Sequence, residues 1–377
     1  MRVQTLLRQH RSELDIDRAG ALVVRGRVVA LDPSTEALAR ARGAGFRVAG
    51  DSTLDDLGIR LVVLVAPQGM RSRTALRRLQ RMDPSGLYDY NHVYLGADAA
   101  SDAAGPMLAQ ASAEARRPQA TATAIRVGLV DSGVAASHAS LAGVQLRTWG
   151  CAGNLHPDAH GTAVASLLAG EPTGDQARAY RQRSELFAAD IYCGAPTGGA
   201  VTGLAQALNW LARERVPVIN LSLVGPPNAL LERLVASMLQ RGHVLVAAVG
   251  NDGPAAPPLY PAAYPGVIGV TAVDTRGRTL PEAARGSQVD FAAPGAGLHA
   301  ADAGGGWKAV RGTSYAAPLV ARRAARGSSA PSPSAALLPS IMARLQSEAS
   351  DAGTKGFDTR YGAGILDDGE QARWSAK

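Results

Sequence analysis

The stretch VPVINLSLVGPPNALLERLVASMLQRGHVLVAAVG, residues 216–250, decides the fold of this chain. Two short and nearly continuous apolar runs, 216–224 and 243–250, flank a segment with helical periodicity at 229–242. Strands without alternating polar residues are typical of sheets that are buried on both faces. Joined by helices, such strands run parallel. The stretch therefore predicts a strand–helix–strand unit of an α/β fold.

The same pattern recurs on either side of this unit. Further apolar runs lie at 124–130, 186–193 and 266–273, and helical stretches such as 161–170 and 201–214 lie between the runs. We expect one parallel sheet flanked by helices on both faces. In such a sheet, functional groups collect at the carboxyl ends of the strands and on the loops beyond them.

The first hundred residues have a different organisation. Helical patterns cover 33–45 and 72–84. Strand patterns cover 20–31, 46–50, 59–67 and 88–97. The order β-α-β-β-α-β predicts a small α+β domain of the ferredoxin-like type. Residues 98–122 are small, polar and without periodicity, as is typical of an exposed linker. We therefore divide the chain into domains at 1–97 and 123–377, joined by this linker.

Composition excludes several classes of protein. The 377 residues are 46% apolar and 19% charged, which is ordinary for a globular protein and argues against disorder. The net charge is +7, and the basic stretch 71–81 is typical of the polar face of an amphipathic helix. Without aromatic platforms or a known motif we expect no nucleic acid partner. No apolar run reaches the roughly 18 residues of a membrane span, so we expect no membrane partner.

Four polar residues fall at predicted strand ends or helix starts. Asp131 follows an apolar strand, His160 opens a helix beside Gly161, Asn251 lies in a glycine-flanked turn, and Ser314 begins a helix. Each has a purely structural interpretation, as a turn residue, a polar helix start or a helix cap. At the same edge of one sheet, however, the four would lie close together.

Together these residues fit one chemistry. A serine hydroxyl becomes a nucleophile when a base such as His160 removes its proton. A carboxylate, here Asp131, holds the imidazole in the right tautomer and stabilises the imidazolium. The amide of Asn251 and the N–H of Ser314 would then donate hydrogen bonds to the oxyanion that forms.

The motifs around these residues are similar to those of the subtilisin-like serine peptidases. The resemblance covers roughly residues 124–366, and it implies a subtilisin-like fold and serine endopeptidase activity on a peptide or protein substrate. The motifs, in chain order, are VDSGV (130–134), HGTAVA (160–165), INLSLVGP (219–226), AAVGNDGP (247–254), GTSYAAPLVA (312–321) and YGAGILD (361–367).

The resemblance also implies a substrate cleft. One segment would pair with an extended substrate as an added strand, and a second would line the primary specificity pocket, with Leu259 near its floor. The first segment consists of Ser222, Leu223, Val224 and Gly225, and the second of Ala248, Val249 and Gly250. Val224 stands where many relatives have glycine. With Leu259, it predicts a preference for small or modest apolar side chains.

The N-terminal domain is similar in architecture to the propeptide of this family. The resemblance implies that it is an intramolecular cap on the active site, removed by a cut within about residues 97–122. We expect a monomer made as a self-capped precursor. The alternative is a catalytically silent protein that keeps the cleft and binds peptides without turnover.

Three departures from the family pattern concern metals and the core. The segment 171–186 lacks the Asn-rich loop with which many relatives hold calcium, so we expect no calcium there. The pair His156 and His160 resembles a metal site, but Pro157 argues against one, and we expect no metal and no cofactor.

Arg322, Arg323 and Arg326 interrupt the small apolar residues that follow Ser314. Because a buried unpaired arginine is costly, we expect this helix to end early or to expose one face.

The chain has two cysteines, Cys151 and Cys193. In the family's sheet the strands that they end are neighbours, which favours a disulfide. The other interpretation is two reduced core cysteines. A disulfide would indicate an oxidising compartment. The start of the chain lacks the apolar region of a signal peptide. We therefore expect an exported protein whose signal lies upstream of this sequence, or a cytoplasmic one if Met1 is the true start.

Overall fold

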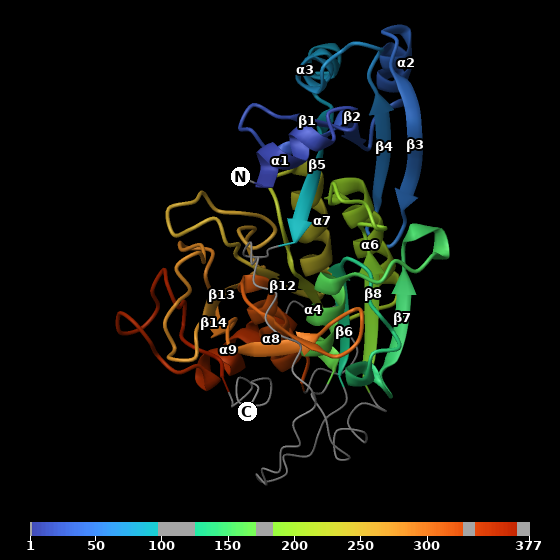
Figure 1. Ribbon diagram of the computed structural model, residues 1–377. Coiled ribbons are helices and arrows are strands. Elements are labelled where there is room, and N and C mark those ends of the chain that lie inside the picture. Colours follow the sequence, from blue (N-terminus) through green and yellow to red (C-terminus); the bar gives the residue numbers. More distant parts are fainter. Residues whose placement is uncertain (1, 97–124, 171–183, 327–335, 368–377) are drawn as a thin grey trace.

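The computed structural model describes residues 2–96, 125–170, 184–326 and 336–367. In the second region of the chain, residues 125–367, seven described strands form one sheet (Figure 1). Each neighbouring pair in this sheet is parallel, as the continuous apolar runs predict. The strands, in spatial order, are β14 (Phe291–Pro294), β13 (Ile268–Val273), β12 (Val244–Ala248), β10 (Val218–Leu221), β6 (Arg126–Asp131), β8 (Glu185–Asp190) and β7 (Gln145–Trp149).

Helices cover both faces of this sheet. On one face, α4 (Ala159–Ala169) and α8 (Thr313–Ala325) bury small side chains against the strands, in a core rich in alanine, valine and leucine. On the other face, α6 (Val201–Arg213) and α7 (Ala229–Gln240) form a second core with larger side chains. The hairpin β15 (Leu298–Ala301)–β16 (Trp307–Val310) and α9 (Leu337–Glu348) complete this region. No helix among the described residues is long and apolar enough to span a membrane.

Residues 2–96 form the predicted α+β unit, preceded by two elements that the sequence did not predict, α1 (Arg2–Gln9) and β1 (Leu14–Ile16). The remaining elements follow the predicted order: β2 (Leu22–Leu31), α2 (Thr35–Gly43), β3 (Arg47–Leu54), β4 (Ile59–Val65), α3 (Ser72–Met82) and β5 (Leu87–Gly96). The spatial order β5-β2-β4-β3 is antiparallel throughout and matches the ferredoxin-like arrangement.

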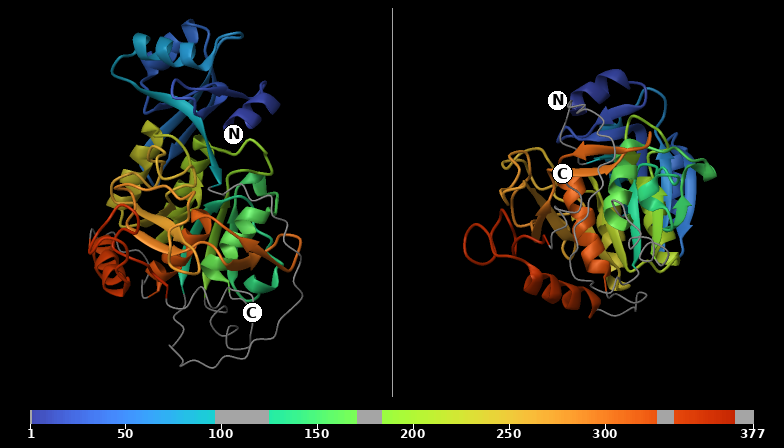
Figure 2. Two further views of the ribbon diagram at one scale, coloured as in Figure 1. Left: turned by 60° about the vertical axis from the view of Figure 1, so that its left-hand side comes forward. Right: turned by 60° about the horizontal axis from the view of Figure 1, so that its bottom comes forward.

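The N-terminal sheet lies between two pairs of helices (Figures 1 and 2). Its β2 residues alternate: Val28 and Ala30 pack under α2 and α3, whereas Val29 and Leu31 join the core formed by α6 and α7. The two regions therefore share one continuous apolar core. The predicted linker 98–122 lies outside the described residues.

The N-terminal sheet also continues into the second region. Strand β5 pairs on one side with β11 (Leu223–Val224) and on the other with β9 (Gly199–Ala200). Both short strands belong to the second region. The last strand of the N-terminal region therefore lies between two segments of the other region, at the point where the chemistry of the site is expected.

Two arginines of α8 (Thr313–Ala325) differ from one expectation drawn from the sequence. Helix α8 continues to Ala325 and encloses Arg322 and Arg323, which are 1% and 8% exposed. The expectation that the helix ends early or exposes one face is wrong because both guanidinium groups have partners. Arg322 Nη1 donates to the carbonyl of Gly170 at 2.8 Å, and Arg323 forms an ion pair with Glu348 of α9.

Candidate active site

Asp131 and His160 meet at the carboxyl end of the parallel sheet. Asp131 is the last residue of β6, and His160 is the second residue of α4. The imidazole Nδ1 and the carboxylate Oδ1 are 2.6 Å apart, and the side chains are 11% and 1% exposed. A carboxylate oxygen accepts hydrogen bonds, so Nδ1 carries the proton and Nε2 is the basic nitrogen of the neutral ring.

Two residues that the sequence analysis did not single out hold this pair in place. Asp158 caps α4 and accepts the N–H of His160 at 2.8 Å. The hydroxyl of Ser132 donates to Asp158 at 2.8 Å and accepts the N–H of Gly161 at 2.9 Å. Gly161 is required here because an added Cβ would lie 2.2 Å from the carbonyl oxygen of Ser132. The sequence offered two signals for these residues: Ser132 directly follows Asp131 in VDSGV, and Asp158 directly precedes AHG.

Ser314 is the second residue of α8, and it is completely buried. Its hydroxyl donates to the carbonyl of Ser222 at 3.3 Å, and the Ser222 hydroxyl donates back to the carbonyl of Ser314 at 2.9 Å. Asn220, which the sequence analysis did not single out, donates to the Ser222 hydroxyl at 2.8 Å. Helix α8 and the segment 222–225 are thus joined directly at the site.

Asn251 follows β12 and lies beside the start of α8. Its Oδ1 accepts the N–H of Thr313 at 3.2 Å, which turns the Nδ2 end of the amide away from Thr313. The hydroxyl of Thr313 in turn accepts the N–H of Gly250 at 3.2 Å. These two bonds fix the turn that carries Asn251 against the residue next to Ser314.

The two helices that carry His160 and Ser314 are in contact at their starts. The rings of His160 and Tyr315, the residue after Ser314, are 5.7 Å apart between centroids. All four residues of the predicted constellation are therefore brought to one edge of the sheet. This edge is the one formed by the carboxyl ends of β6 and β12, as parallel topology requires.

The end of the N-terminal region covers this site. In the register of β5, Gly96 is opposite Leu223 and Leu95 is opposite Val224, so the predicted substrate-pairing segment is occupied by the chain itself. Gly96 lies over the imidazole: an added Cβ would be 3.4 Å from Cε1 of His160 and 3.5 Å from Nε2. The last described residue of β5 is therefore next to the basic nitrogen.

Tyr94 anchors this strand. Its side chain is completely buried in the core shared with α6 and α7, and its hydroxyl donates to the carbonyl of Pro226 at 2.8 Å. Its ring packs on Gly225, where an added Cβ would lie 2.5 Å from the ring. Burial raises the pKa of Tyr94 well above its usual value, so the hydroxyl remains a donor. The sequence of 88–97 predicted a strand but not this contact.

The residues expected around a specificity pocket also converge. Ala248 and Val249 are completely buried, and Gly250 has φ 101°. An added Cβ on Gly250 would lie 2.7 Å from Leu259 and 3.6 Å from Val224. The two side chains expected to limit the pocket thus both lie next to the same glycine.

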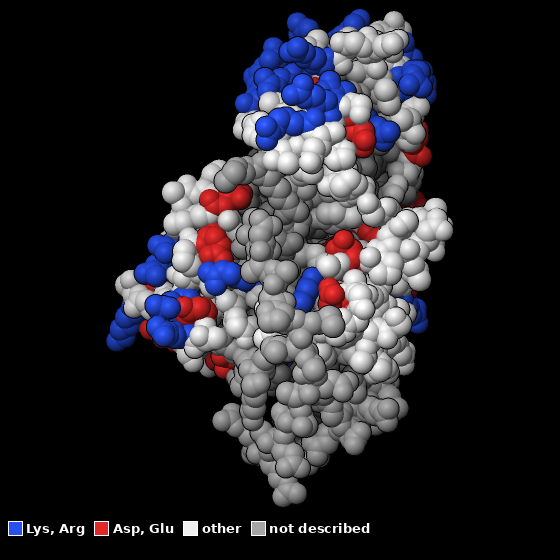
Figure 3. All heavy atoms as spheres, in the orientation of Figure 1, with Lys and Arg blue, Asp and Glu red and all other residues white. Residues whose placement is uncertain are grey.

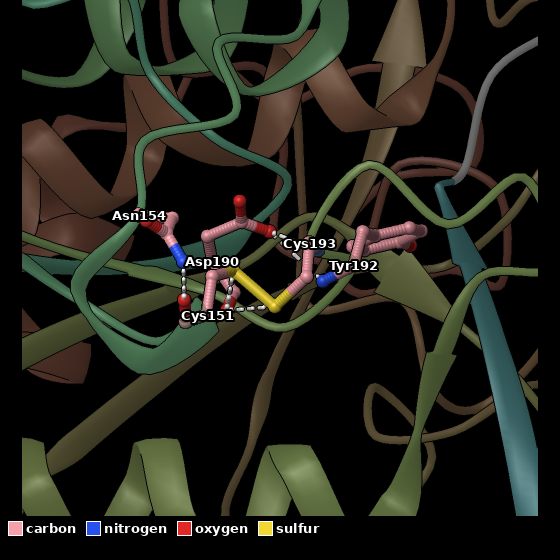
Figure 4. The surroundings of a disulfide bond; sticks show 5 residues. All are labelled: Cys151, Asn154, Asp190, Tyr192 and Cys193. Carbon is pink, nitrogen blue, oxygen red and sulfur yellow. Dashed lines mark hydrogen bonds between the residues drawn. A yellow bond between two sulfur atoms is a disulfide. The ribbon is translucent and has the colours of Figure 1, made fainter.

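A disulfide joins Cys151 and Cys193 beside the site (Figure 4). Their Cα atoms are 5.2 Å apart, beyond the ends of the paired strands β7 and β8. Asp190, at the end of β8, accepts the N–H groups of Tyr192 and Cys193, both at 2.9 Å, and fixes the turn that carries Cys193.

Residues of the types that bind metal ions lie close together beside this disulfide. Within the described part of the chain, one group of three such residues clusters, Cys151, Asp190 and Cys193, with ligand atoms within 4.8 Å of one another. Because the two sulfurs are bonded to each other, they do not supply thiolates. His156 precedes α4, which begins at Ala159, so His156 and His160 do not share a helix. The calcium prediction for 171–186 falls mostly outside the described residues.

Comparison with known proteins gives a family match. A family model described as Peptidase_S8, Subtilase family, matches residues 122–364. Subtilisin BL from Lederbergia lenta is 36% identical over 167 residues, which is 44% of this chain and 61% of that protein. The chain thus spans about three fifths of the length of this curated relative.

Solved structures extend the likeness. The self-cleaved protease domain of PatA is 26% identical with a TM-score of 0.55, covering 66% of this chain and 94% of that one. Fervidolysin from Fervidobacterium pennivorans, a keratinolytic enzyme related to subtilisin, is 18% identical with a TM-score of 0.69. That match covers 93% of this chain and 61% of the other, so the likeness in fold extends over the N-terminal region.

Proposed function

Because the chain belongs to the subtilase family, we propose that it is a serine endopeptidase that hydrolyses peptide bonds in protein or peptide substrates. The observation that carries the proposal is the 2.6 Å contact between His160 and Asp131, made beside the start of the helix that bears Ser314. Family membership alone gives the class of enzyme, and this contact supports turnover in this particular chain.

In the proposed mechanism, Nε2 of His160 removes the proton of the Ser314 hydroxyl as its oxygen attacks the substrate carbonyl. Asp131 stabilises the imidazolium through the bond to Nδ1. The tetrahedral oxyanion accepts hydrogen bonds from Nδ2 of Asn251 and from the N–H of Ser314, which lies in the first turn of α8 and has no partner within the helix ladder. His160 then gives its proton to the leaving amine, and water hydrolyses the acyl-enzyme.

We propose further that residues 2–96 are an intramolecular cap that occupies the cleft before processing. Pairing of β5 with β11 and β9 supports this, because an extended substrate would add to the same two strands. Gly96 lies over His160, so the bonds that follow it along the chain are the nearest candidates for self-cleavage. The cut is proposed near the start of the segment 97–122.

The same strand suggests what the cleft accepts. Tyr94 fills a closed apolar site, Gly96 leaves no bulk over the imidazole, and the next residue in the sequence is Ala97. Val224 and Leu259 flank Gly250 and would limit a larger side chain in the specificity pocket. The proposed substrates therefore carry a small residue before the scissile bond and an aromatic residue three positions earlier.

Purification of the full-length chain beside Ser314→Ala tests activity and processing together. Wild type should shorten to roughly residues 97–377 or less, and its new N-terminus should lie within 97–122 by mass spectrometry. Ser314→Ala should remain at full length. Shortening of both proteins at the same bond would assign the cut to another protease.

The catalytically silent alternative is separated by a fluorophosphonate probe. Labelling of Ser314 in processed wild type, absent from Ser314→Ala, supports the enzyme. Folded and processed protein that neither labels nor hydrolyses a peptide with the sequence of residues 93–102 would support the silent protein instead. Cleavage profiling with a strong preference for Phe, Tyr or Lys before the scissile bond would contradict the proposed specificity.

We also propose an oxidising compartment, outside the cytoplasm, as the place where this protein works. The disulfide between Cys151 and Cys193 supports this, because such bonds persist in secreted and periplasmic proteins. Intact-mass measurement after alkylation, with and without reductant, tests it in protein taken from its native compartment. Two freely alkylated thiols there would contradict the proposal.

A further inference from the structure

The helices that carry the base and the nucleophile run side by side in the same direction. His160 and Ser314 are each the second residue of their helix, so α4 and α8 both begin at the site. Their other ends also lie together, where Arg322 of α8 reaches Gly170, the residue that caps the end of α4. The relative position of the two helices therefore sets the relative position of the base and the nucleophile.

Parallel helices with a shared direction bring like charges together at their far ends. The last carbonyls of each helix have no partner in the helix ladder, and the helix dipole makes this end partially negative. Two such ends side by side repel each other unless a cation lies between them. A buried arginine in the last turn of α8 supplies both the positive charge and the donors that these carbonyls need.

Arg322 is placed for this task. It is 1% exposed, and its Nη1 donates to the carbonyl of Gly170 at 2.8 Å. A second arginine serves the end of α8 itself: Arg344 of α9 donates through Nη2 to the carbonyls of Arg323 at 3.1 Å and Ala324 at 3.2 Å. Each of the two helix ends thus has a guanidinium donor, and the donor of α4 comes from the helix of the nucleophile.

We propose that Arg322 is a positioning residue that fixes α4 against α8 and so holds His160 in reach of Ser314. The inference rests on the proposed peptidase function. Arg322 lies about two turns beyond Ser314, and Gly170 about three turns beyond His160. The two helices are therefore joined at their far ends by this bond and at their near ends by the contact of His160 with Tyr315. Neither helix can slide along the other without breaking one of these two contacts.

The neighbouring residue provides a matched control. Arg323 is in the same turn of α8, is 8% exposed, and forms an ion pair with Glu348 of α9. Loss of Arg323 removes a buried guanidinium group from the same turn of α8. It breaks the contact with α9 and leaves the bond of Arg322 to Gly170 in place. An effect of Arg322 that Arg323 does not share therefore concerns the link to α4.

The experiment compares processed wild type with Arg322→Met, Arg322→Lys and Arg323→Met, using a fluorogenic peptide with the sequence of residues 93–102. Arg322→Met should lower kcat about tenfold with KM nearly unchanged, because misplacement of a catalytic group slows the chemical step. Arg322→Lys should recover most of kcat, because an ammonium group can also donate to the carbonyl of Gly170. Arg323→Met should keep kcat even if its melting temperature falls.

Equal kcat in Arg322→Met and wild type would overturn the proposal, as would an Arg322→Lys variant that is as slow as Arg322→Met. Should Arg322→Met fail to fold, Arg322→Gln replaces it. The proposal then requires a fall in kcat that is smaller than the fall expected for Arg322→Met. An unchanged kcat in Arg322→Gln would overturn the proposal.

Hydrogen exchange in α4 provides a readout that does not depend on turnover. In the Ser314→Ala background, Arg322→Met should speed exchange in peptides covering 159–169, and Arg323→Met should not. Equal exchange in the two variants would contradict the proposal. Absence of turnover in wild type would contradict the peptidase function, whereas this exchange comparison would still decide the role of Arg322.

Discussion

The parallel sheet of residues 125–367 and the antiparallel sheet of residues 2–96 place their polar side chains differently. In the parallel sheet, the carboxyl ends of β6 and β12 lie at one edge, so Asp131 and Asn251 both stand at that edge, in contact with the first residues of α4 and α8. In the antiparallel sheet, successive strands end at opposite edges, and their polar residues are dispersed. One region can therefore build a constellation, whereas the other contributes a single strand, β5, that fills it.

The two regions also differ in charge. In the view of Figure 3, arginine and lysine side chains gather over the N-terminal region. Helix α3 buries Ala75, Leu76 and Leu79 and exposes Arg77 and Arg81, as the sequence of 71–81 predicts. The basic face points away from the site, and the apolar face of the sheet points toward α6 and α7. The N-terminal region therefore meets its neighbour through its apolar face and through hydrogen bonds of β5, among them the bond from the N–H of Ala229 to Asp89, and not through its basic face.

One buried polar network crosses between the regions. His92 of β5 contacts Asp17 at 3.2 Å through Nε2 and Asn228 at 2.9 Å through Nδ1. The Oδ1 of Asn228 already accepts the N–H groups of Leu230 and Leu231 as the cap of α7, so its Nδ2 faces the imidazole. Nδ1 of His92 is therefore an acceptor in this arrangement, and the bond specifies how the strand docks.

The largest effect is expected when the contact of β5 with the second region is broken. In the Ser314→Ala background, Tyr94→Ala should weaken docking of the N-terminal region by about 4 kcal/mol, because a buried aromatic ring and its hydrogen bond are lost. Hydrogen exchange of peptides covering 87–96 measures the opening free energy. Tyr94→Phe is the control and should cost about 1 kcal/mol, since only the hydroxyl is lost. Unchanged exchange in Tyr94→Ala would show that the strand is not held by this side chain.

A smaller effect is expected when the disulfide of the second region is removed. Both cysteines of the chain belong to the second region, so a Cys151→Ser, Cys193→Ser double variant should destabilise that region. A bond between residues 42 apart contributes about 3 kcal/mol. Denaturant unfolding in the Ser314→Ala background measures the loss. Reductant should bring the parent protein to the stability of the double variant and leave the variant unchanged. A parent protein that unfolds at the same denaturant concentration after complete reduction would refute the prediction.

The smallest effect concerns a buried carboxyl of the parallel sheet. Burial raises the pKa of Asp290 to about 6 from 3.8, although the N–H of Gly269, 2.8 Å from its Oδ2, lowers it. The folded state thus favours the protonated acid. Its stabilising contribution is complete below pH 3.8 and is lost as the pH rises through about 6. Asp290→Asn should therefore stabilise the protein by about 1–2 kcal/mol at pH 8.

Urea unfolding of Asp290→Asn at a series of pH values checks this sign. The gain over the parent should shrink as the pH falls from 7 to 4, because the parent acid becomes protonated. Asparagine can still accept the N–H of Gly269 through its carbonyl oxygen. A variant that is less stable than its parent at pH 8, or a difference that is the same at pH 4 and pH 8, would show that Asp290 is ionised without penalty.

Much of the fold could be predicted because the local pattern and the packing agree. Continuous apolar runs predicted β6, β8, β10, β12 and β13, and the β-α-β-β-α-β order predicted the N-terminal unit. The short strand β9 was not predicted, because two residues carry no periodicity, whereas β11 lies within the segment 222–225 that was expected to pair with an extended strand. They exist because β5 lies between them. The buried arginines of α8 were misjudged because partners at Gly170 and Glu348 are remote in the chain.

The sequence by itself determined where the four residues of the predicted constellation stand, since Asp131, His160, Asn251 and Ser314 are each placed where a buried strand or a packed helix must end or begin. Residue type and order are local properties, and parallel topology places such ends at one edge. Tertiary structure alone decided that Gly96 covers His160, that Tyr94 is buried beside Gly225, and that Arg322 bonds to Gly170. These contacts join segments far apart in the chain, and their energies depend on burial and hydrogen-bond geometry, which no local pattern records.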